Sequence, residues 1–236
     1  MADEEPEHLK LARELVEQVK PDHNRYDAKP TRIVWPDEAG PNSPVSNNSV
    51  CSSFSAALLR KAYRLDKSDL VKLFSEEWPE ADDMFEGVQK SREFDTIDSV
   101  KNLKPGDFLL VDYLSNKAIP TGHVMLVSGE PEKVQRWSTA DLPLKFASEA
   151  STTEFREGQV FEWHVRVIDS SKSPHGKEDT RYRSVDGEDD DGVGEGPIRL
   201  LCNDEGKILG YTWSTFSNSR LWLVEDRPIL IARWKR

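Results

Sequence analysis

Cys51 stands at the start of residues 50–63, the clearest helical pattern in the chain. Phe54 and Leu58 follow it at i+3 and i+7 and share its helix face, so the thiol points toward the protein body. The unpaired N–H groups and the macrodipole at a helix N-terminus favour a thiolate, the nucleophilic form of cysteine. The competing interpretation is a small buried hydrophobic residue, the usual environment of a free cysteine.

His123 and Asp169 have the residue types that would complete a site at this thiol. His123 opens the apolar run 123–127, where an imidazole can reach the end of a sheet. Asp169 ends the run 163–169 and lies on its apolar face at the period of a strand. If these strands are antiparallel neighbours, His123 meets Asp169. The trio would then be a nucleophile, a base and a carboxylate that fixes the imidazole tautomer; the alternative is three unrelated core and rim residues.

The elements that must position these residues are helices in the first half of the chain and strands in the second. Helices followed by strands indicate an α+β fold, with N-terminal helices packed on one side of a mostly antiparallel sheet. Prolines between residues 21 and 50 predict a long loop with one short strand at 31–35, and Asn48 or Ser49 is the expected N-cap of the Cys51 helix. The predicted helices cover residues 8–20, 50–63, 67–76 and 81–90, and the predicted strands cover 108–113, 122–128, 160–169, 198–202, 208–215 and 228–233.

Three blocks of this sequence resemble the NlpC/P60 superfamily of papain-like cysteine peptidases. Ser-Val-Cys-Ser-Ser-Phe at 49–54 is similar to the family's Asp-Cys-Ser-Gly-Phe helix start. Leu-Lys-Pro-Gly-Asp-Phe at 103–108 is similar to its Leu-x-Pro-Gly-Asp turn, and Gly-His-Val-Met-Leu-Val-Ser-Gly at 122–129 to its histidine strand. Asp169 falls where the family places its third polar residue, so the resemblance covers about residues 45–171.

The resemblance implies a papain-like fold and hydrolysis of an amide bond, often in bacterial cell-wall peptides, without a cofactor or a metal. Cys51 would be the nucleophile, His123 the base and Asp169 the third member of the triad. One alternative is an acyltransferase or esterase on the same scaffold, since a fold does not fix a function. Another is a non-catalytic glycan- or peptide-binding module. In that module Cys51 and His123 would lie beyond hydrogen-bond reach, or Cys51 would be sealed from solvent.

The sequence departs from the family pattern at four places. Val50 stands where the family has Asp, Ser53 stands where it has Gly, and Asp169 stands where it commonly has His, Asn or Gln. The linker 127–160 is far longer than the family's hairpin and is long enough to build a lid or a narrow cleft. These differences affect the expected substrate more than the expected fold.

Polar and aromatic residues follow the third triad position and suggest a substrate-binding rim, the alternative being an ordinary surface extension. We expect a single domain over 1–236, made of an N-terminal helix and loop (1–44), a catalytic core (45–171) and a C-terminal extension that completes the sheet (172–236). The candidate substrate-binding residues are Asn48, Ser52, His175, Asp179, Arg181 and Trp213.

Eight acidic residues between 178 and 195 predict a mobile, solvated surface loop. A divalent-metal loop is the sharper alternative, but it fails the EF-hand template because Gly187 stands where the first Asp ligand belongs. His175, Asp179 and the acids of 186–191 match no standard metal-ligand spacing.

Composition excludes several classes of protein. The chain has 236 residues, with 43 Asp and Glu against 32 Lys and Arg, and its net charge of −11 argues against nucleic acid as the main partner. Two cysteines cannot form a disulfide framework, and Cys202 is expected to be a small packed residue. No window approaches the roughly 20 apolar residues of a membrane helix. The partner expected instead is a peptide or a peptidoglycan-like substrate, bound by a monomer.

The first ten residues, MADEEPEHLK, are acidic and polar where a secretory signal needs a basic and then apolar start. The sequence as given therefore predicts a cytoplasmic location. A periplasmic or extracellular location stays open if a signal peptide has been removed.

Overall fold

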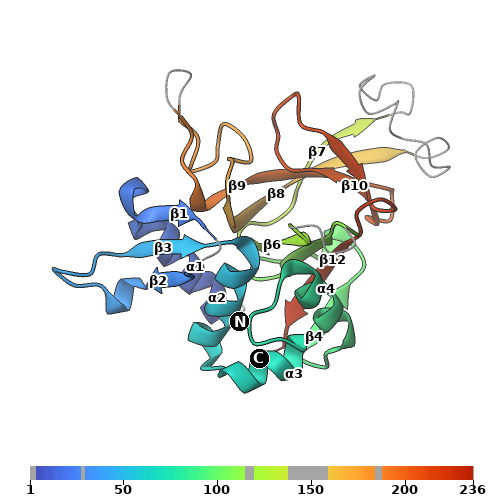
Figure 1. Cartoon of the computed structure of the whole chain (residues 1–236). Coiled ribbons are helices and arrows are strands. Elements are labelled where there is room, and N and C mark those ends of the chain that lie inside the picture. The colour runs from blue at the N-terminus through green and yellow to red at the C-terminus, as the bar shows by residue number, and fades with distance from the viewer. Residues whose placement is uncertain (1–3, 28–29, 115–119, 138–158, 184–187, 236) are drawn as a thin grey trace.

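The computed structural model describes residues 4–27, 30–114, 120–137, 159–183 and 188–235. This part of the chain has four α-helices, a large antiparallel sheet and a small three-stranded sheet (Figure 1). The predicted α+β class is confirmed. The helices are α1 (Glu7–Gln18), α2 (Cys51–Tyr63), α3 (Lys67–Phe74) and α4 (Ala81–Lys90), with short 3-10 turns at Pro21–His23, Pro36–Glu38 and Val100–Asn102.

The start of α2 differs from the expected capping pattern. Asn48 and Ser49 are still extended in strand β3 (Ser46–Ser49), so neither caps the helix and that prediction is wrong. Val50 is the N-cap, and its side chain has no atom that could accept a hydrogen bond. Ser53, three residues on, supplies the acceptor instead: its Oγ lies 3.0 Å from the Val50 N–H. Ser53 therefore stabilises the helix start.

A small sheet precedes α2 where the sequence predicted mainly loop. Its strand order is β1 (Asn24–Tyr26), β3 and β2 (Arg32–Val34), with β1 parallel and β2 antiparallel to β3. These strands are too short and too polar to give an apolar alternation, which explains why β1 and β3 were not predicted. The register places Tyr26 beside Ser49, two residues before the cysteine.

The large sheet is antiparallel at every pair of strands in the described residues. All six predicted strands are present, and β4, β7 and β11 are additional. Strand β12, from the C-terminal part of the chain, pairs with β5 on one side and β4 on the other. The strand order of the large sheet is β11 (Leu221–Leu223), β10 (Ile208–Thr212), β9 (Gly192–Cys202), β8 (Val160–Ser171), β6 (Gly122–Val127), β5 (Phe108–Asp112), β12 (Ile229–Trp234) and β4 (Phe94–Ile97). Strand β7 (Glu132–Trp137) pairs with β8 beside this path.

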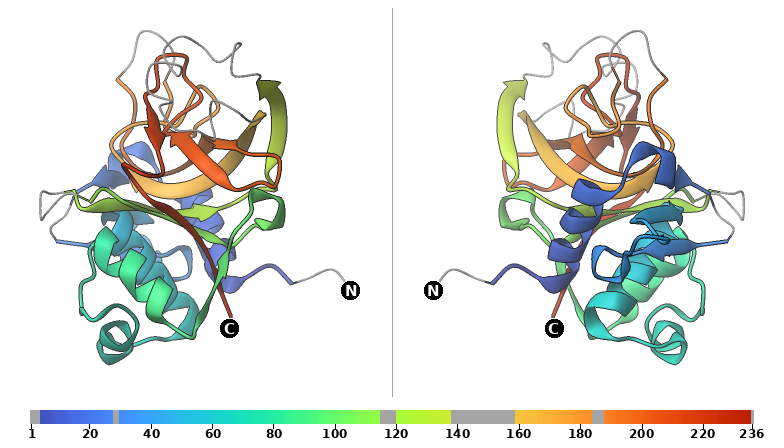
Figure 2. Two further views of the ribbon diagram at one scale, coloured as in Figure 1. Left: turned by 90° about the vertical axis from the view of Figure 1, so that its right-hand side faces the viewer. Right: turned by 90° about the vertical axis from the view of Figure 1, so that its left-hand side faces the viewer.

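The two faces of the sheet pack against different cores, as strand alternation requires. Leu110 and Val124 point toward the helices, which lie on one side of the sheet (Figure 2). Val111 and Met125, their neighbours along the strands, point into a second core formed with β8–β10. Cys202 is fully buried in this second core, as predicted for a packed residue, and burial raises the pKa of its thiol.

The described part of the long linker after β6 contains β7, which pairs with the first half of β8 as an antiparallel ribbon. Residues 138–158, in which a lid was expected, lie outside the described residues. In the described part of the chain, no helix combines the length and apolar character needed to cross a membrane.

Candidate active site

Cys51 is held in place by the small sheet and by the end of β8. It is the first residue of α2, directly after β3, and 5% of its surface is exposed. The hydroxyl of Ser170, on β8, donates to the carbonyl of Ser49 at 2.8 Å. This bond ties β3 to β8 just before the cysteine, so the helix start and the large sheet are fixed relative to each other.

His123 lies between Cys51 and Asp169. Its Nε2 lies 2.5 Å from Oδ2 of Asp169, and the ring also forms a hydrogen bond with Cys51. Because Nε2 contacts the carboxylate, Nδ1 is the nitrogen left to face the sulfur. Antiparallel pairing of β6 and β8, with Leu126 opposite Ile168, brings the start of one strand beside the end of the other. The structure thus brings the three residues together as the strand patterns predict.

Asp169 is fully buried and has three positively charged or protonatable neighbours. Its Oδ2 contacts both His123 and Nε2 of His175, the latter at 3.0 Å. Nη2 of Arg181 lies 2.9 Å from Oδ1 but is not aligned for a hydrogen bond. The same guanidinium pairs with Asp179 through two bonds, Nε–Oδ1 at 2.9 Å and Nη2–Oδ2 at 2.8 Å.

Asp179 and Arg181 are therefore buried behind the triad, and their predicted place on a substrate-binding rim is wrong. Arg181 is 1% exposed. The pairing also corrects one part of the expected acidic loop, because Asp179 is internal and β9 begins at Gly192, whereas the acids at 188–189 are exposed as expected of a solvated loop; Asp186 lies outside the described residues. An unpaired buried charge is costly, so this acid and this base are buried together.

Two glycines of β9 make room for this buried ion pair. A Cβ at Gly194 would lie 2.5 Å from Nε of Arg181, and one at Gly196 would lie 2.3 Å from Oδ2 of Asp179. Gly194 is the register partner of Asp169. The alternating glycines of this strand therefore face the buried charges next to the triad carboxylate.

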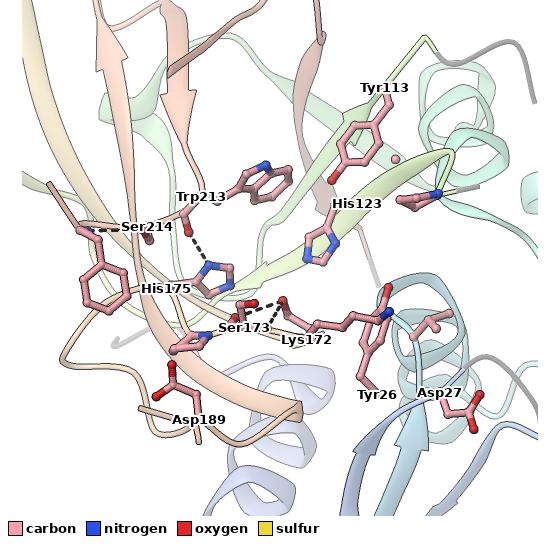
Figure 3. Close-up of a pocket in the computed structure, with 16 residues that line it drawn as sticks. Tyr26, Asp27, Tyr113, His123, Lys172, Ser173, His175, Asp189, Trp213 and Ser214 are labelled. Atoms are coloured by element: carbon pink, nitrogen blue, oxygen red, sulfur yellow. Dashed lines mark hydrogen bonds between the residues drawn. The ribbon is translucent and has the colours of Figure 1, made fainter. Parts of the chain in front are cut away.

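An open cleft of about 870 Å³ lies in front of His123 (Figure 3). His175 and Trp213 line it, as predicted for a rim, although His175 is only 3% exposed. Cys51 itself is not among the lining residues, but its neighbour Val50 is. The other lining residues are mainly aromatic or small and polar, with one lysine: Tyr26, Asp27, Tyr113, Pro120, Gly122, Ser171, Lys172, Ser173, Pro174, Asp189, Ser214 and Phe216.

Asn48 and Ser52, also expected to bind substrate, do not line this cleft. Asn48 points to the outer face of the small sheet, where its Nδ2 donates to the carbonyl of Pro30 at 2.7 Å. Ser52 is buried and borders a separate apolar groove beside α2. Alternation along β3 explains the first miss, because Asn47 and Ser49 point inward and Asn48 points outward.

Tyr26 and Tyr113 line the cleft on either side of His123, and the sequence alone did not identify them (Figure 3). Burial raises the pKa of Tyr26 to about 12, helped by the charges of Cys51 and Asp169. Burial also raises the pKa of Tyr113, with contributions from Tyr211 and Cys51. Both phenols therefore keep their protons at neutral pH and can donate hydrogen bonds into the cleft.

The electrostatics of the trio favour a protonated His123 beside an ionised Asp169. Burial alone would lower the pKa of His123, but the charge of Cys51 and hydrogen bonds to Asp169 and Cys51 raise it to about 10. Burial would raise the pKa of Asp169, but the charges of His175 and Arg181 and the bonds from both histidines hold it well below its usual range. At neutral pH the carboxylate is therefore ionised and His123 is an imidazolium.

The described residues contain no group of three or more His, Cys, Asp or Glu side chains that could hold a metal ion. The candidate metal ligands His175 and Asp179 are already occupied by contacts within the protein. Nδ1 of His175 lies 2.5 Å from the carbonyl oxygen of Trp213, Nε2 faces Asp169, and Asp179 is paired with Arg181.

One known protein aligns with nearly the whole chain. It is the uncharacterized protein R653 of Acanthamoeba polyphaga mimivirus, which is 31% identical over 239 aligned positions that cover 97% of this chain and 96% of the viral protein. No family model and no solved structure matches the chain. An identity of 31% along nearly the full length of both proteins shows common descent. The chain therefore belongs to the same family as this mimivirus protein.

Proposed function

We propose that this protein is a cysteine hydrolase of the NlpC/P60 type that cleaves an amide bond. The observation that carries the proposal is His123, which lies between Cys51 and Asp169 within hydrogen-bond contact of both. A nucleophile at a helix start, a base beside it and a third group that orients the base are the parts this chemistry needs. The open cleft gives a substrate a path to His123 and to Val50, the residue before Cys51.

The proposed reaction has two steps. The Cys51 thiolate attacks the substrate carbonyl carbon, and the imidazolium of His123 gives its Nδ1 proton to the leaving amine, so that the C–N bond breaks and a thioester forms. His123, now neutral, takes a proton from water as the oxygen attacks the thioester. The acid product leaves, and the thiolate–imidazolium pair is restored.

The oxyanion of each tetrahedral intermediate needs hydrogen-bond donors. The backbone N–H of Cys51 is one, because it is unpaired at the start of α2. We propose the Tyr26 hydroxyl as the second, since Tyr26 lies in the cleft, keeps its proton, and is close enough to Cys51 for the charge of that residue to raise its pKa.

The direct test is hydrolysis of labelled muropeptides by the wild type and by three variants. Cys51→Ser and His123→Ala should abolish product formation, because each removes a reacting group. Cys202→Ala, which alters the other cysteine in the distant second core, should retain it. A Cys51→Ser protein with wild-type activity would refute a thiol mechanism, and product analysis with added amine acceptors would separate hydrolysis from acyl transfer.

Tyr26→Phe should lower kcat by about 100-fold with a much smaller change in KM, the usual effect of losing one oxyanion donor. Tyr113→Phe is the comparison variant, because Tyr113 also lines the cleft and is also close enough to Cys51 for the charge of that residue to raise its pKa; a larger loss of kcat in Tyr113→Phe would assign the donor to Tyr113 instead. Steady-state kinetics on the same substrate measure both. Equal kcat values for Tyr26→Phe and the wild type would exclude Tyr26 as a donor.

The contact between Cys51 and His123 argues against a pure binding module, but the burial of Cys51 agrees with one, so the binding module stays as an alternative that the hydrolysis assay tests. Esterase and acyltransferase chemistry use the same groups and stay as alternatives for the product analysis.

A further inference from the structure

We infer that His175 is a positioning residue for the triad: a second imidazole that holds the Asp169 carboxylate, and through Trp213 the ring of His123, in the reactive arrangement. The inference rests on the proposed function and assigns a role to a residue that the sequence suggested only as a substrate contact.

The contacts form a closed ring of four residues. His123 Nε2 lies 2.5 Å from Asp169 Oδ2, and the same oxygen lies 3.0 Å from Nε2 of His175. Nδ1 of His175 lies 2.5 Å from the Trp213 carbonyl oxygen, a contact drawn in Figure 3. The indole of Trp213 then packs edge-on against the His123 ring, with centroids 5.0 Å apart at 75°. His123 is thus restrained by the carboxylate at one nitrogen and by the indole at its ring.

Within the described residues, the ring nitrogens of His175 have no other hydrogen-bond partner. Both ring nitrogens are therefore occupied, Nδ1 by the Trp213 carbonyl oxygen and Nε2 by the Asp169 carboxylate. The main chain of His175 is fixed as well: its N–H donates to Oδ2 of Asp179 at 2.8 Å, and its carbonyl accepts from the N–H of Thr215 at 2.8 Å. A side chain held at this many points has little freedom to turn toward a substrate.

This arrangement explains why a single carboxylate oxygen can orient His123. Oδ1 has only the unaligned guanidinium of Arg181 beside it, so hydrogen bonds at Oδ2 set the plane of the carboxylate. His175 supplies a second hydrogen bond at Oδ2, beside the one from His123. Without it, the contact with His123 is the one hydrogen bond left to fix Oδ2 among the described residues.

The experiment compares His175→Gln with His175→Asn, because a Gln amide can reach the position of Nε2 and an Asn amide the position of Nδ1. Two readouts need no substrate: the rate of Cys51 alkylation by iodoacetamide at pH 6, and the titration of His123 followed by NMR. We expect Gln to retain wild-type behaviour. We expect Asn to slow alkylation by about tenfold and to lower the His123 midpoint, since a displaced carboxylate supports the imidazolium less well.

Several outcomes would overturn the inference. These are equal behaviour of the two variants, a His123 midpoint that rises in His175→Asn, or a midpoint that does not move. Near-UV circular dichroism checks folding, and His175→Phe, which keeps a ring but lacks both nitrogens, replaces the Asn variant if that variant is unfolded. If no substrate is hydrolysed but the Gln and Asn variants differ as expected, the proposed function fails and the positioning role stands.

Discussion

Replacing His123 with Ala is expected to slow the alkylation of Cys51 by iodoacetamide at pH 6 by about 10- to 100-fold. Only the thiolate reacts, and an ordinary free thiol is roughly 0.3% ionised at this pH. In the wild type the imidazolium contacts Cys51 and supplies the opposite charge that the thiolate needs. The rate is read by mass spectrometry on the peptide that contains Cys51.

Two features make this experiment clean. Cys202, the other cysteine, is fully buried, so the native protein should take up a single label. His23→Ala is the matched control, because His23 is exposed and lines a different pocket, so its loss should leave the rate unchanged. If His123→Ala reacts as fast as the wild type, the thiolate–imidazolium pair does not exist.

The largest stability effect is expected for Arg181→Met, a loss of about 3–5 kcal/mol in the free energy of unfolding. Methionine keeps much of the side-chain volume but leaves Asp169 and Asp179 buried without their shared counter-charge. Urea unfolding at pH 7 measures the loss. Arg183→Met is the control, because Arg183 pairs with Asp190 at the surface, with 45% of its side chain exposed, and should cost less than about 1 kcal/mol.

The loss of unfolding free energy in Arg181→Met is expected to depend on pH. Asp169 has a folded-state pKa well below its usual range, so its stabilising contribution is present above the unfolded pKa of about 3.9 and disappears as the pH falls through the folded value. In Arg181→Met this contribution is weakened. The difference from the wild type should therefore be largest near pH 7 and shrink below about pH 4. A difference that stays constant with pH would mean that packing, and not charge, explains the loss.

The triad could be predicted because each member obeys a local rule. Cys51 starts a helix with an apolar period, His123 is the second residue of an apolar strand, and Asp169 lies two residues before the end of a strand, where it is buried. Antiparallel pairing then joins the two strand ends without any further information. The same alternation rule also accounts for the double core, in which neighbours such as Leu110 and Val111 point to opposite sides of the sheet.

The layer behind the triad could not be predicted in this way. Asp179 and Arg181 stand in a segment whose acidic composition is typical of a solvated loop, and only tertiary structure shows that they pair with each other and with Asp169. A signal was nevertheless present: glycines at 192, 194 and 196 alternate on one face of a strand and leave space for large side chains. Alternating glycines on a strand next to one that carries a buried acid therefore indicate space for a buried ion pair.

Tyr26 was missed for a different reason. It lies on a three-residue strand, and its neighbour in the sheet is Ser49, 23 positions further on in the chain. A parallel pairing of two such short polar strands has no periodic signature, so the residue reaches the cleft through topology alone. The order of the large sheet, with β12 inserted between β5 and β4, is also set by long-range pairing.

The central claim is that Cys51 and His123 form an ion pair oriented by Asp169, and the titration of the His123 imidazole tests it most directly. Histidine labelled with ¹⁵N, assigned with the His123→Ala variant, reports the protonation of each ring nitrogen across pH 5–11. We expect His123 to keep both ring protons until about pH 10 in the wild type, and the midpoint to fall in Cys51→Ala, which removes the neighbouring negative charge. A midpoint near the ordinary value of about 6.5, unchanged in Cys51→Ala, would contradict the ion pair and the mechanism built on it.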